Sequence, residues 1–327
     1  MARRTTLTDV AKAADVDVSL VSRVLRGEEV KVKDETRERI LASARELDYR
    51  PNAIARSLKS AKAGAYGLVI PTFNNPVYAQ IITGAEAAVA RLSCVLLTLS
   101  GEGWDRAASL DALNGGRVDG LLIAGGTSLD VAELRVPWLL VNRTAPGVER
   151  SVVLADAEAA RIAVGHLRAL GHEHVVFLQG PSESDTARRR FAGFEEAARE
   201  AGMRTEPPIQ ADYTYQGGYA AMRHALGQER RFTGVVAANV TSAIGALQAL
   251  LEHGVAIPRE VSIVAIHDAE IAGMVNPRLT TVQMPLAQLG QRAIELLTTT
   301  TPTERIGEVV DDPMQLVVRD STGPVPR

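Results

Sequence analysis

The 327-residue chain contains a single cysteine and few aromatic residues, and both shortages narrow what it can be. One cysteine cannot form an internal disulfide or a cysteine-based zinc site. Because Cys94 opens the apolar run Cys94-Val95-Leu96-Leu97, we expect a buried core residue; the alternative is a redox sensor at an exposed, electropositive site. Phe, Trp and Tyr make up only 4% of the chain, so aliphatic side chains must fill the cores.

Long apolar runs are also absent. No run approaches the ~18 residues that span a membrane. No apolar segment follows the opening Met-Ala-Arg-Arg-Thr-Thr, so we expect no signal peptide and a cytoplasmic protein, associated with the nucleoid if it binds DNA. A hydrophobic content of 46% and a charged content of 23% are ordinary for folded proteins and exclude bulk disorder. At ~100–200 residues per domain, the length indicates two or three domains.

Charge is distributed unevenly along the chain. Residues 1–60 carry 13 Lys and Arg against 10 Asp and Glu, whereas the remainder carries 23 against 29. A basic front and an acidic remainder permit a nucleic-acid-binding head on a soluble body. The excess of basic residues is small, so a nucleic-acid-binding role must be argued from sequence motifs.

The first 50 residues predict short helices. Residues 6–9 have the Thr-x-x-acid form of a helix start. Asp15 tolerates a left-handed turn, and Asp17 can cap a second helix that begins at Val18 and ends at Gly27. Two short helices joined by a tight turn form a helix-turn-helix. A third helix is expected over 34–47, slightly frayed at its start, with Asp34 as its cap because Lys33 has no capping side chain.

The sequence after residue 50 has a different pattern of apolar residues. Pro51 stops the third helix, residues 52–58 can form one more short helix, and residues 59–64 are small and polar, as in a linker. Continuous apolar strands then alternate with helices, which indicates parallel sheets covered on both faces and two doubly wound subdomains. The strands are expected at 66–70, 94–99, 119–124, 138–141, 175–178, 234–238 and 262–266, and the helices at 76–92, 156–170, 187–201, 217–226, 240–253 and 285–298.

Ordered motifs along the whole chain resemble those of the LacI family of bacterial transcription regulators. In the head they are LTDVAKAA at 7–14, VSRVL at 21–25, TRERIL at 36–41 and LDYRPNAIARSL at 47–58; in the body they are GLVIP at 67–71, NP at 75–76, RVDGL at 117–121, HLRALGH at 166–172, RFAGF at 190–194 and LTTV at 279–282. The resemblance implies a helix-turn-helix head (1–50), a hinge helix and linker (51–64), and a two-lobed α/β body similar to periplasmic binding proteins (65–327). It implies a ligand-gated DNA-binding repressor.

The head's second helix is expected in the major groove, with its first residues on base edges. Those residues are Val18 and Ser19, with Arg23 one turn later. Arg23 can bond guanine with two donors; the alternative is a phosphate or surface contact. Thr8 and Ser22 are candidate phosphate contacts, which position the head without specifying sequence.

Residues 52–58 resemble the family's hinge helix, which enters the minor groove at the centre of the site. Leu58 matches the leucine that wedges a central base step; the alternative is that it packs on the head. Ala55 is small enough for two such helices to approach closely. Arg56 and Lys59 would neutralise phosphates, and Asn52 opens the segment.

The resemblance implies an effector pocket between the lobes, lined by Phe73, Asn142, Arg190, Tyr213, Asn239 and His267. Three positions depart from the family pattern: His267 stands where an acid usually grips sugar hydroxyls, Val240 replaces an Asp, and Met284 replaces a polar residue. We expect a less hydroxylated or an anionic ligand, unless His267 is structural and a neutral sugar still binds.

Other classes of function are less consistent with the sequence. The absent signal peptide and the head argue against a transporter's solute-binding protein, and no Gly-x-Gly-x-x-Gly motif, P-loop or nucleophile elbow indicates an enzyme. A regulator that has lost ligand control remains an alternative. His172, Glu173 and His174 belong to a helix-to-strand turn, so we expect neither metal nor cofactor. No heptad segment follows residue 321, so we expect a dimer that binds a near-palindromic DNA site.

Overall fold

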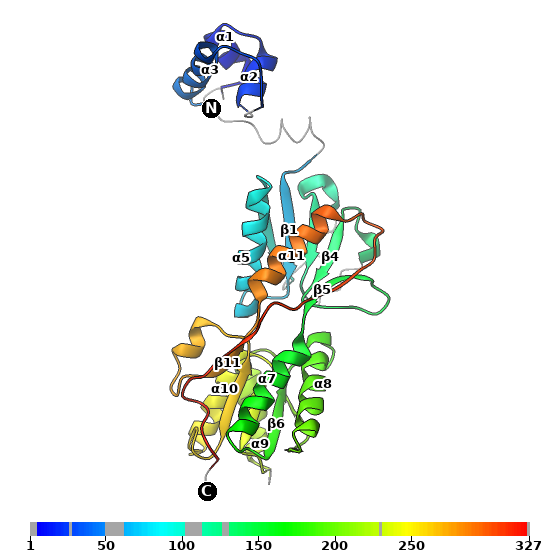
Figure 1. The fold of residues 1–327 in the computed structure, drawn as a ribbon, viewed down its shortest axis with the longest axis vertical. Helices are drawn as coiled ribbons and strands as arrows, with labels where there is room; N and C mark the ends of the chain where they lie inside the picture. Colours follow the sequence, from blue (N-terminus) through cyan, green and yellow to red (C-terminus); the bar gives the residue numbers. More distant parts are fainter. Residues whose placement is uncertain are drawn as a thin grey trace. The chain divides into compact units, whose positions relative to one another are not determined.

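The computed structural model describes residues 5–25, 28–49, 62–101, 113–125, 131–228 and 231–325. The chain divides into two compact units, the head (residues 1–63) and the body (residues 64–327) (Figure 1). The expected hinge helix at 52–58, the linker residue Lys59 and the stop at Gly27 lie outside the described residues.

The head contains three helices around a small aliphatic core. The helices are α1 (Leu7–Ala14), α2 (Val18–Leu25) and α3 (Asp34–Glu46). The expected start of α1 is confirmed: Thr6 and Asp9 form a reciprocal capping box. Asp15 adopts the left-handed conformation with φ of 50°, and the Asp17 carboxylate accepts from the backbone N–H of Ser19 at 2.7 Å. These local contacts set the tight turn between α1 and α2.

The start of α3 differs from expectation. Asp34 was expected to cap this helix, but it lies inside the first turn, and Lys33 occupies the cap position without a side-chain hydrogen bond. The Lys33 carbonyl still accepts from the N–H groups of Thr36 and Arg37. An acid in the first turn favours the helix through the helix dipole, so α3 forms without a side-chain cap.

The body contains two sheets and therefore two lobes. In the N-terminal lobe the strand order is β12-β5-β4-β3-β1-β2, and all neighbouring strands are parallel. Helices α5 and α11 cover one face, and the kinked turn η1 and the short η2 lie on the other. The elements are β1 (Ala65–Ile70), α5 (Pro76–Arg91), β2 (Val95–Ser100), η1 (Leu113–Arg117), β3 (Gly120–Ile123), η2 (Val131–Glu133), β4 (Trp138–Val141), β5 (Arg150–Leu154), α11 (Leu286–Thr299) and β12 (Ile306–Val310).

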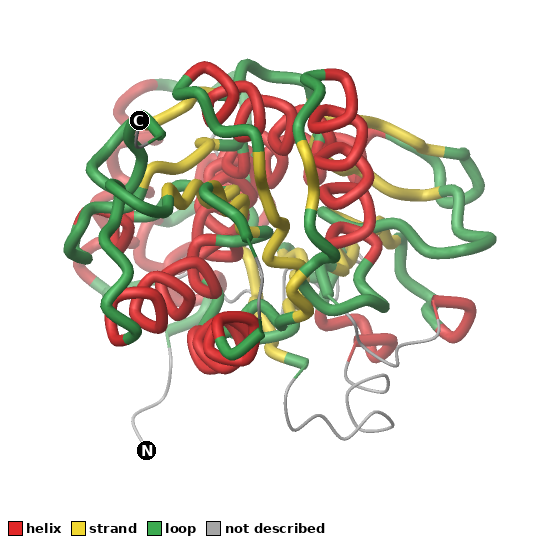
Figure 2. The backbone as a smooth tube through the Cα atoms, turned by 90° about the horizontal axis from the view of Figure 1, so that it is seen from below, coloured by secondary structure: helices red, strands yellow, loops and turns green. Residues whose placement is uncertain are grey.

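The C-terminal lobe repeats this architecture. Its strand order is β13-β11-β10-β9-β6-β7, with β8 also paired to β6 and only β13 antiparallel. Helices α7 and α8 pack on one face, and α9 and α10 on the other (Figure 1). Figure 2 shows the helices flanking the strands. The elements are α7 (Asp156–Ala169), β6 (His174–Gln179), α8 (Asp185–Glu200), β7 (Arg204–Thr205), β8 (Ile209–Gln210), α9 (Tyr215–Leu226), β9 (Gly234–Ala237), α10 (Val240–Glu252), β10 (Ser262–Ile266), η3 (Glu270–Gly273), β11 (Thr280–Gln283) and β13 (Gln315–Val317).

The expected fold class is confirmed: a helical head is followed by two doubly wound subdomains. All seven expected strands and six expected body helices occur, with ends shifted by a residue or two. Six strands were not anticipated, namely β5, β7, β8, β11, β12 and β13. Strands β7, β8 and β13 are only two or three residues long, and β11 and β12 mix polar with apolar residues. Strand β5 begins with Arg150 and Ser151 and has an apolar run of only three residues.

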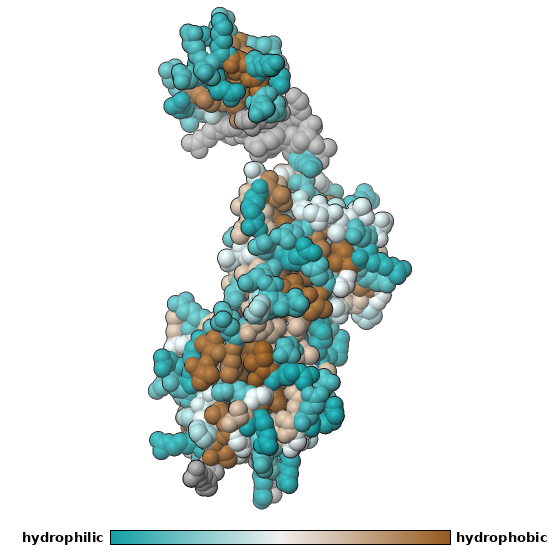
Figure 3. Space-filling model, in the orientation of Figure 1, coloured by the Kyte–Doolittle hydropathy of each residue, from teal (hydrophilic) through white to brown (hydrophobic). Residues whose placement is uncertain are grey.

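The chain crosses three times between the lobes, after β5, after β11 and after β12. The two termini of the body therefore belong to different lobes, and each lobe is built from segments far apart in sequence. Figure 3 shows a mainly hydrophilic surface on which apolar side chains gather over the C-terminal lobe, around the positions of β11 and α10. Among the described residues, no helix is long and apolar enough to cross a membrane.

Cys94 is only half-buried, which corrects the expectation of a fully buried core residue. It precedes β2, the edge strand of its sheet, and packs against the core from one side. An edge position leaves part of the residue uncovered.

Two helical glycines give a matched test of the packing. A Cβ on Gly84 in α5 would lie 1.8 Å from the backbone oxygen of Ala287 in α11, whereas a Cβ on Gly165 in α7 would meet nothing within 4 Å. Gly84→Ala is expected to lower the free energy of unfolding by about 1–3 kcal/mol through overpacking. Gly165→Ala should raise it by about 0.5–1 kcal/mol, because alanine loses less backbone entropy. Urea unfolding of both variants checks this; equal effects would contradict the close approach of α5 and α11.

Candidate functional site

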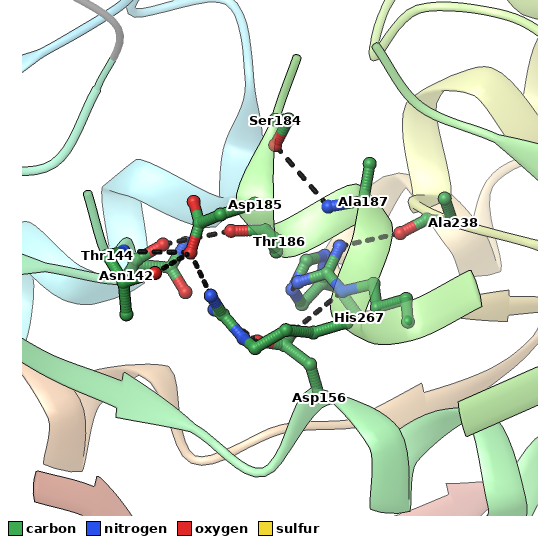
Figure 4. Close-up of polar contacts among 11 residues, drawn as sticks. Asn142, Thr144, Asp156, Ser184, Asp185, Thr186, Ala187, Ala238 and His267 are labelled. Atoms are coloured by element: carbon green, nitrogen blue, oxygen red, sulfur yellow. Dashed lines mark hydrogen bonds and ion pairs between the residues drawn. The ribbon is translucent and has the colours of Figure 1, made fainter. Parts of the chain in front are cut away.

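The carboxyl ends of parallel strands bring together polar residues where the two lobes meet. Asn142 follows β4 in the N-terminal lobe, and His267 follows β10 in the C-terminal lobe. Arg190 of α8 donates to His267 at this place. Figure 4 shows Asn142 and His267 on either side of α8, with Thr186 between them. Thr186, one turn before Arg190, donates through its hydroxyl to the backbone oxygen of Asn142 at 3.0 Å. Helix α8 therefore connects Asn142 with Arg190 and His267.

Arg190 is the largest fully buried side chain of the body, with 1% of its surface exposed. Its Nε donates to Asp156 Oδ1 at 2.7 Å, its Nη1 to the backbone oxygen of Ala238 at 2.6 Å, and its Nη2 to His267 Nε2 at 2.8 Å. Each guanidinium nitrogen thus already has a partner within the protein. This arrangement fixes the side chain and orients the His267 ring.

The charges beside Arg190 balance. Asp156 also accepts from Arg189, whose Nη2 lies 2.7 Å from Asp156 Oδ2, and Arg189 forms a second ion pair with Asp185. Asp185 in turn accepts from the backbone N–H of Thr144 at 2.7 Å. Two arginines and two aspartates carry no net charge, so a bound molecule need not neutralise Arg190.

His267 is held as a neutral ring. Burial lowers the pKa of His267 well below its usual value, and the positive charge of Arg190 lowers it further. Its backbone has φ of 73°, a left-handed conformation that is uncommon for histidine. This backbone conformation, directly after β10, allows the His267 imidazole to contact the Arg190 guanidinium.

Three buried polar atoms among the described residues lack a hydrogen-bond partner: Asn142 Oδ1, the Tyr213 hydroxyl oxygen and His267 Nδ1. All three belong to the six residues expected to line the effector pocket. Leaving a buried polar group unpaired costs about 1–3 kcal/mol, and such exceptions require an explanation. A ligand that pairs with these atoms provides one.

The other expected pocket residues are placed differently. The Asn239 side chain is used within the protein: its Oδ1 accepts from the backbone N–H of Ser242 at 3.0 Å at the start of α10, and its Nδ2 donates to the Tyr213 backbone oxygen at 3.1 Å. Phe73 lies in the loop between β1 and α5 and is 60% exposed. Both remain predictions as ligand contacts.

Several residues of this region were not anticipated. Asp156 and Thr186 hold Arg190 and Asn142, as described above. Tyr78 in the first turn of α5 is close enough to Tyr213 and Arg190 to interact electrostatically with both, and burial raises its pKa. Gln80 donates to the Asp268 backbone oxygen at 2.7 Å and so joins α5 to the loop after β10. Local sequence gave one weak signal: Asp156 is an acid at the first position of α7, two residues after the end of β5.

A surface cavity of about 320 Å³ lies elsewhere, at the amino ends of β4, β5 and β12. Arg150 lines it but donates to the backbone oxygens of Trp138, Thr301 and Glu304, so its hydrogen-bonding groups are used to hold the loop before β12. None of the unpaired buried atoms lies there. The polar cluster between the lobes is therefore the stronger candidate site.

Metal-ligating groups do not cluster in the described part of the chain: no group of three or more His, Cys, Asp or Glu could hold an ion. In the expected helix-to-strand turn, both ring nitrogens of His172 are already used, by the Thr233 hydroxyl at 2.9 Å and the Gly323 backbone oxygen at 3.2 Å.

The head presents the expected DNA-facing residues on its surface. Thr8 at the start of α1 is exposed, as are Val18, Ser19 and Arg23 on α2, while Ser22 is half-buried. Val18 and Ser22, and likewise Ser19 and Arg23, are one turn apart, so the four share one side of the helix. Arg23 forms an exposed ion pair with Glu28, its Nε 3.3 Å from Glu28 Oε2. Asn52, Ala55, Arg56 and Leu58 lie outside the described residues.

The head and body together define a two-part regulatory protein, and comparison with known proteins gives its family. Residues 6–52 match the model of bacterial regulatory proteins of the lacI family, and residues 164–322 match that of the periplasmic binding protein-like domain. The ribose operon repressor of Haemophilus influenzae is 30% identical over 301 residues, which cover 89% of this chain and 90% of that protein. Catabolite control protein A of Priestia megaterium is 31% identical over 97% of this chain and 99% of that protein. The chain belongs to the lacI family, as its motifs indicated.

Solved structures agree with this assignment. The lac repressor dimer bound to operator and the anti-inducer ONPF has a TM-score of 0.84 at 26% identity, covering 98% of this chain and 100% of that chain. The complex of the transcriptional regulator CelR with cellobiose has a TM-score of 0.70 at 28% identity, covering 97% of this chain and 100% of that chain.

Proposed function

We propose that this protein is a dimeric transcriptional repressor that binds a near-palindromic operator and is controlled by a small molecule bound between the lobes of its body. The observation that carries ligand control is the set of unpaired buried atoms on Asn142, Tyr213 and His267. The DNA-binding role is supported by the exposed side of α2 and by family membership. The ribose operon repressor and catabolite control protein A match 89% and 97% of this chain.

The head reads DNA through Val18, Ser19 and Arg23, with Thr8 and Ser22 on phosphates. Residues 51–64 act as the hinge, with Asn52, Ala55, Arg56 and Leu58 in the minor groove, between a head of 1–50 and a body of 65–327. Phe73, Arg190 and Asn239 complete the effector site. The protein acts by binding rather than by catalysis, in the cytoplasm, at the nucleoid where its operators lie. Ligand and operator affinities are then coupled reciprocally, typically by about 1–3 kcal/mol.

The second copy of the chain is proposed to pack on the outer side of α9 and α10. Tyr215, Tyr219 and Arg223 follow one another at four-residue spacing on α9; the two rings stack at 6.3 Å and Arg223 lies over Tyr219. On α10, Glu252 accepts from the Tyr219 hydroxyl, and its neighbour Leu251 is 37% exposed. Tyrosine and arginine beside exposed leucine is the composition typical of protein interfaces.

Selection of bound DNA from a random library tests the proposed function. We expect enrichment of a palindromic site with a central pyrimidine–purine step, because such steps kink easily. Arg23→Ala should weaken binding to that site by about 1–3 kcal/mol and relax the preference at one position of each half-site. Lys12→Ala, a basic residue on α1, is the matched control for general loss of charge. No enriched site, with or without added metabolites, would contradict the repressor assignment.

A regulator of this family without ligand control is the second candidate, favoured by the departures at His267, Val240 and Met284. Val240 and Met284 are both buried. Thermal unfolding in the presence of a metabolite collection separates the two: a ligand that binds the folded state raises the midpoint.

A further inference from the structure

The hydrogen bond between Arg190 and His267 fixes which ring nitrogen carries the proton. A guanidinium can only donate, so His267 Nε2, 2.8 Å from Arg190 Nη2, must accept. Turning the ring over would place a C–H group against the donor. A neutral imidazole with an accepting Nε2 carries its hydrogen on Nδ1. His267 therefore offers one N–H donor, and that atom is buried without a partner.

This donor reverses the polarity expected at the position. A carboxylate accepts hydrogen bonds from ligand hydroxyls, whereas Nδ1–H of His267 requires a lone pair from the ligand. The ring cannot adapt by swapping its proton, because Arg190 is held from its other side by Asp156 at 2.7 Å and by the Ala238 backbone oxygen at 2.6 Å.

The surroundings of this donor also set the charge of its partner. Asp156 and Asp185 already neutralise Arg189 and Arg190 through ion pairs. An anion would therefore find both of these arginines already neutralised, and neither would compensate the desolvation of its charge. The hypothesis of an anionic ligand, which relied on Arg190, loses its basis.

We propose that the effector is an uncharged molecule that presents a hydrogen-bond acceptor, such as a carbonyl oxygen or a ring nitrogen, to Nδ1–H of His267. This inference rests on the proposed function, because it names the ligand chemistry of the same site. Asn142, whose backbone oxygen accepts from Thr186 one turn before Arg190 on α8, takes an N–H or O–H donor from the same molecule on its Oδ1. His267 thus selects a ligand by a donor where an acid would select hydroxyl groups.

Nitrogen NMR of the full-length protein, labelled with ¹⁵N only in histidine, tests this directly. The chain has six histidines, and the His267→Gln variant identifies the signals of His267. We expect a protonated, pyrrole-type Nδ1 and an unprotonated, pyridine-type Nε2. The opposite tautomer, or a doubly protonated ring at neutral pH, would overturn the proposal.

Three small probes then test the kind of partner. Acetamide is a neutral acceptor, acetate an anionic acceptor and methylammonium a cationic donor. Acetamide is expected to shift the Nδ1 signal in a saturable way, methylammonium is not, and acetate should bind no more tightly than acetamide. A response to methylammonium alone, tenfold tighter binding of acetate, or no response to any probe would each overturn the proposal.

Two variants of His267 separate its donor from its role beside Arg190. In His267→Gln the longer amide can still accept from Arg190 but lacks the donor at the δ position, so acetamide binding should weaken about five- to tenfold. In His267→Asn the amide N–H replaces the Nδ1 donor, and asparagine tolerates the positive φ, so binding should persist. If neither variant folds, the wild-type NMR experiments still decide. Operator selection, which depends on the head, shows separately whether the repressor assignment holds.

Discussion

Replacing Asp156 with alanine is expected to lower the free energy of unfolding by about 3–5 kcal/mol, because it leaves a buried positive charge uncompensated. Asp156 is 1% exposed and Arg190 equally so. The carboxylate accepts from Arg190 at 2.7 Å through one oxygen and from Arg189 at 2.7 Å through the other. Arg189 retains Asp185 after the substitution, but Arg190 retains only neutral partners, Ala238 and His267.

Urea unfolding of the full-length protein measures this change. Asp156→Asn keeps an acceptor oxygen of similar shape and removes the charge, so its loss should be smaller than that of the alanine variant. Glu196→Ala is the matched surface control: Glu196 pairs with Arg161 at 3.2 Å, but both side chains are largely solvated and Arg161 retains Glu158 and Glu200. A loss for Asp156→Ala no larger than that for Glu196→Ala would show that the ion pair does not hold Arg190.

The Asp156→Asn variant separates the effect of the ion pair on stability from its effect on acetamide binding. If Arg190 orients His267, a folded Asp156→Asn protein should retain its structure but bind acetamide less tightly, since the guanidinium is less firmly fixed. Unchanged binding would mean that Ala238 and His267 alone hold the guanidinium in place.

Local signals in the sequence predicted much of this architecture. The capping box at Thr6, the turn at Asp15 and the cap at Asp17 each depend on residues within three positions, so sequence alone locates them. Seven of the strands could be predicted because each is a continuous apolar run. The cap expected at Asp34 was wrong, because α3 begins after Lys33 without any side-chain cap, and capping preferences do not predict such a start.

In the candidate site, too, some residues could be predicted from the sequence and others could not. The family resemblance predicted Asn142 and His267, and their positions directly after β4 and β10 agree with the rule that ligands bind at the carboxyl ends of parallel strands. The partners of these residues could not be predicted: Asp156 is 34 positions from Arg190, and Gln80 is 188 from Asp268, so only the packed fold brings them together. The charge balance of Arg189 and Arg190 is likewise a property of such long-range pairs. A departure from the family pattern, as at His267, predicts a change in the ligand. The kind of ligand follows only from the contacts of His267 with Arg190.

The dimer surface gives the second large prediction. Leu251→Glu is expected to convert the protein to a monomer, since it places a carboxylate beside Glu252 in the centre of the proposed contact on α9 and α10. Leu251 is 37% exposed, so the folded body should tolerate the change. A single head reads only one half of a palindromic site. Operator affinity should therefore fall about 1,000-fold or more, toward the affinity for random DNA.

Sedimentation velocity measures the oligomeric state, and a DNA titration measures the affinity. Val309→Glu is the matched control, because Val309 is an exposed apolar residue, at 53%, on β12 at the edge of the other sheet. It should leave both the dimer and operator binding unchanged. If Leu251→Glu remained a dimer with full operator affinity, the second copy would have to pack on another surface. If it became a monomer yet kept full affinity, one head would suffice for recognition, and the near-palindromic operator would have no structural basis.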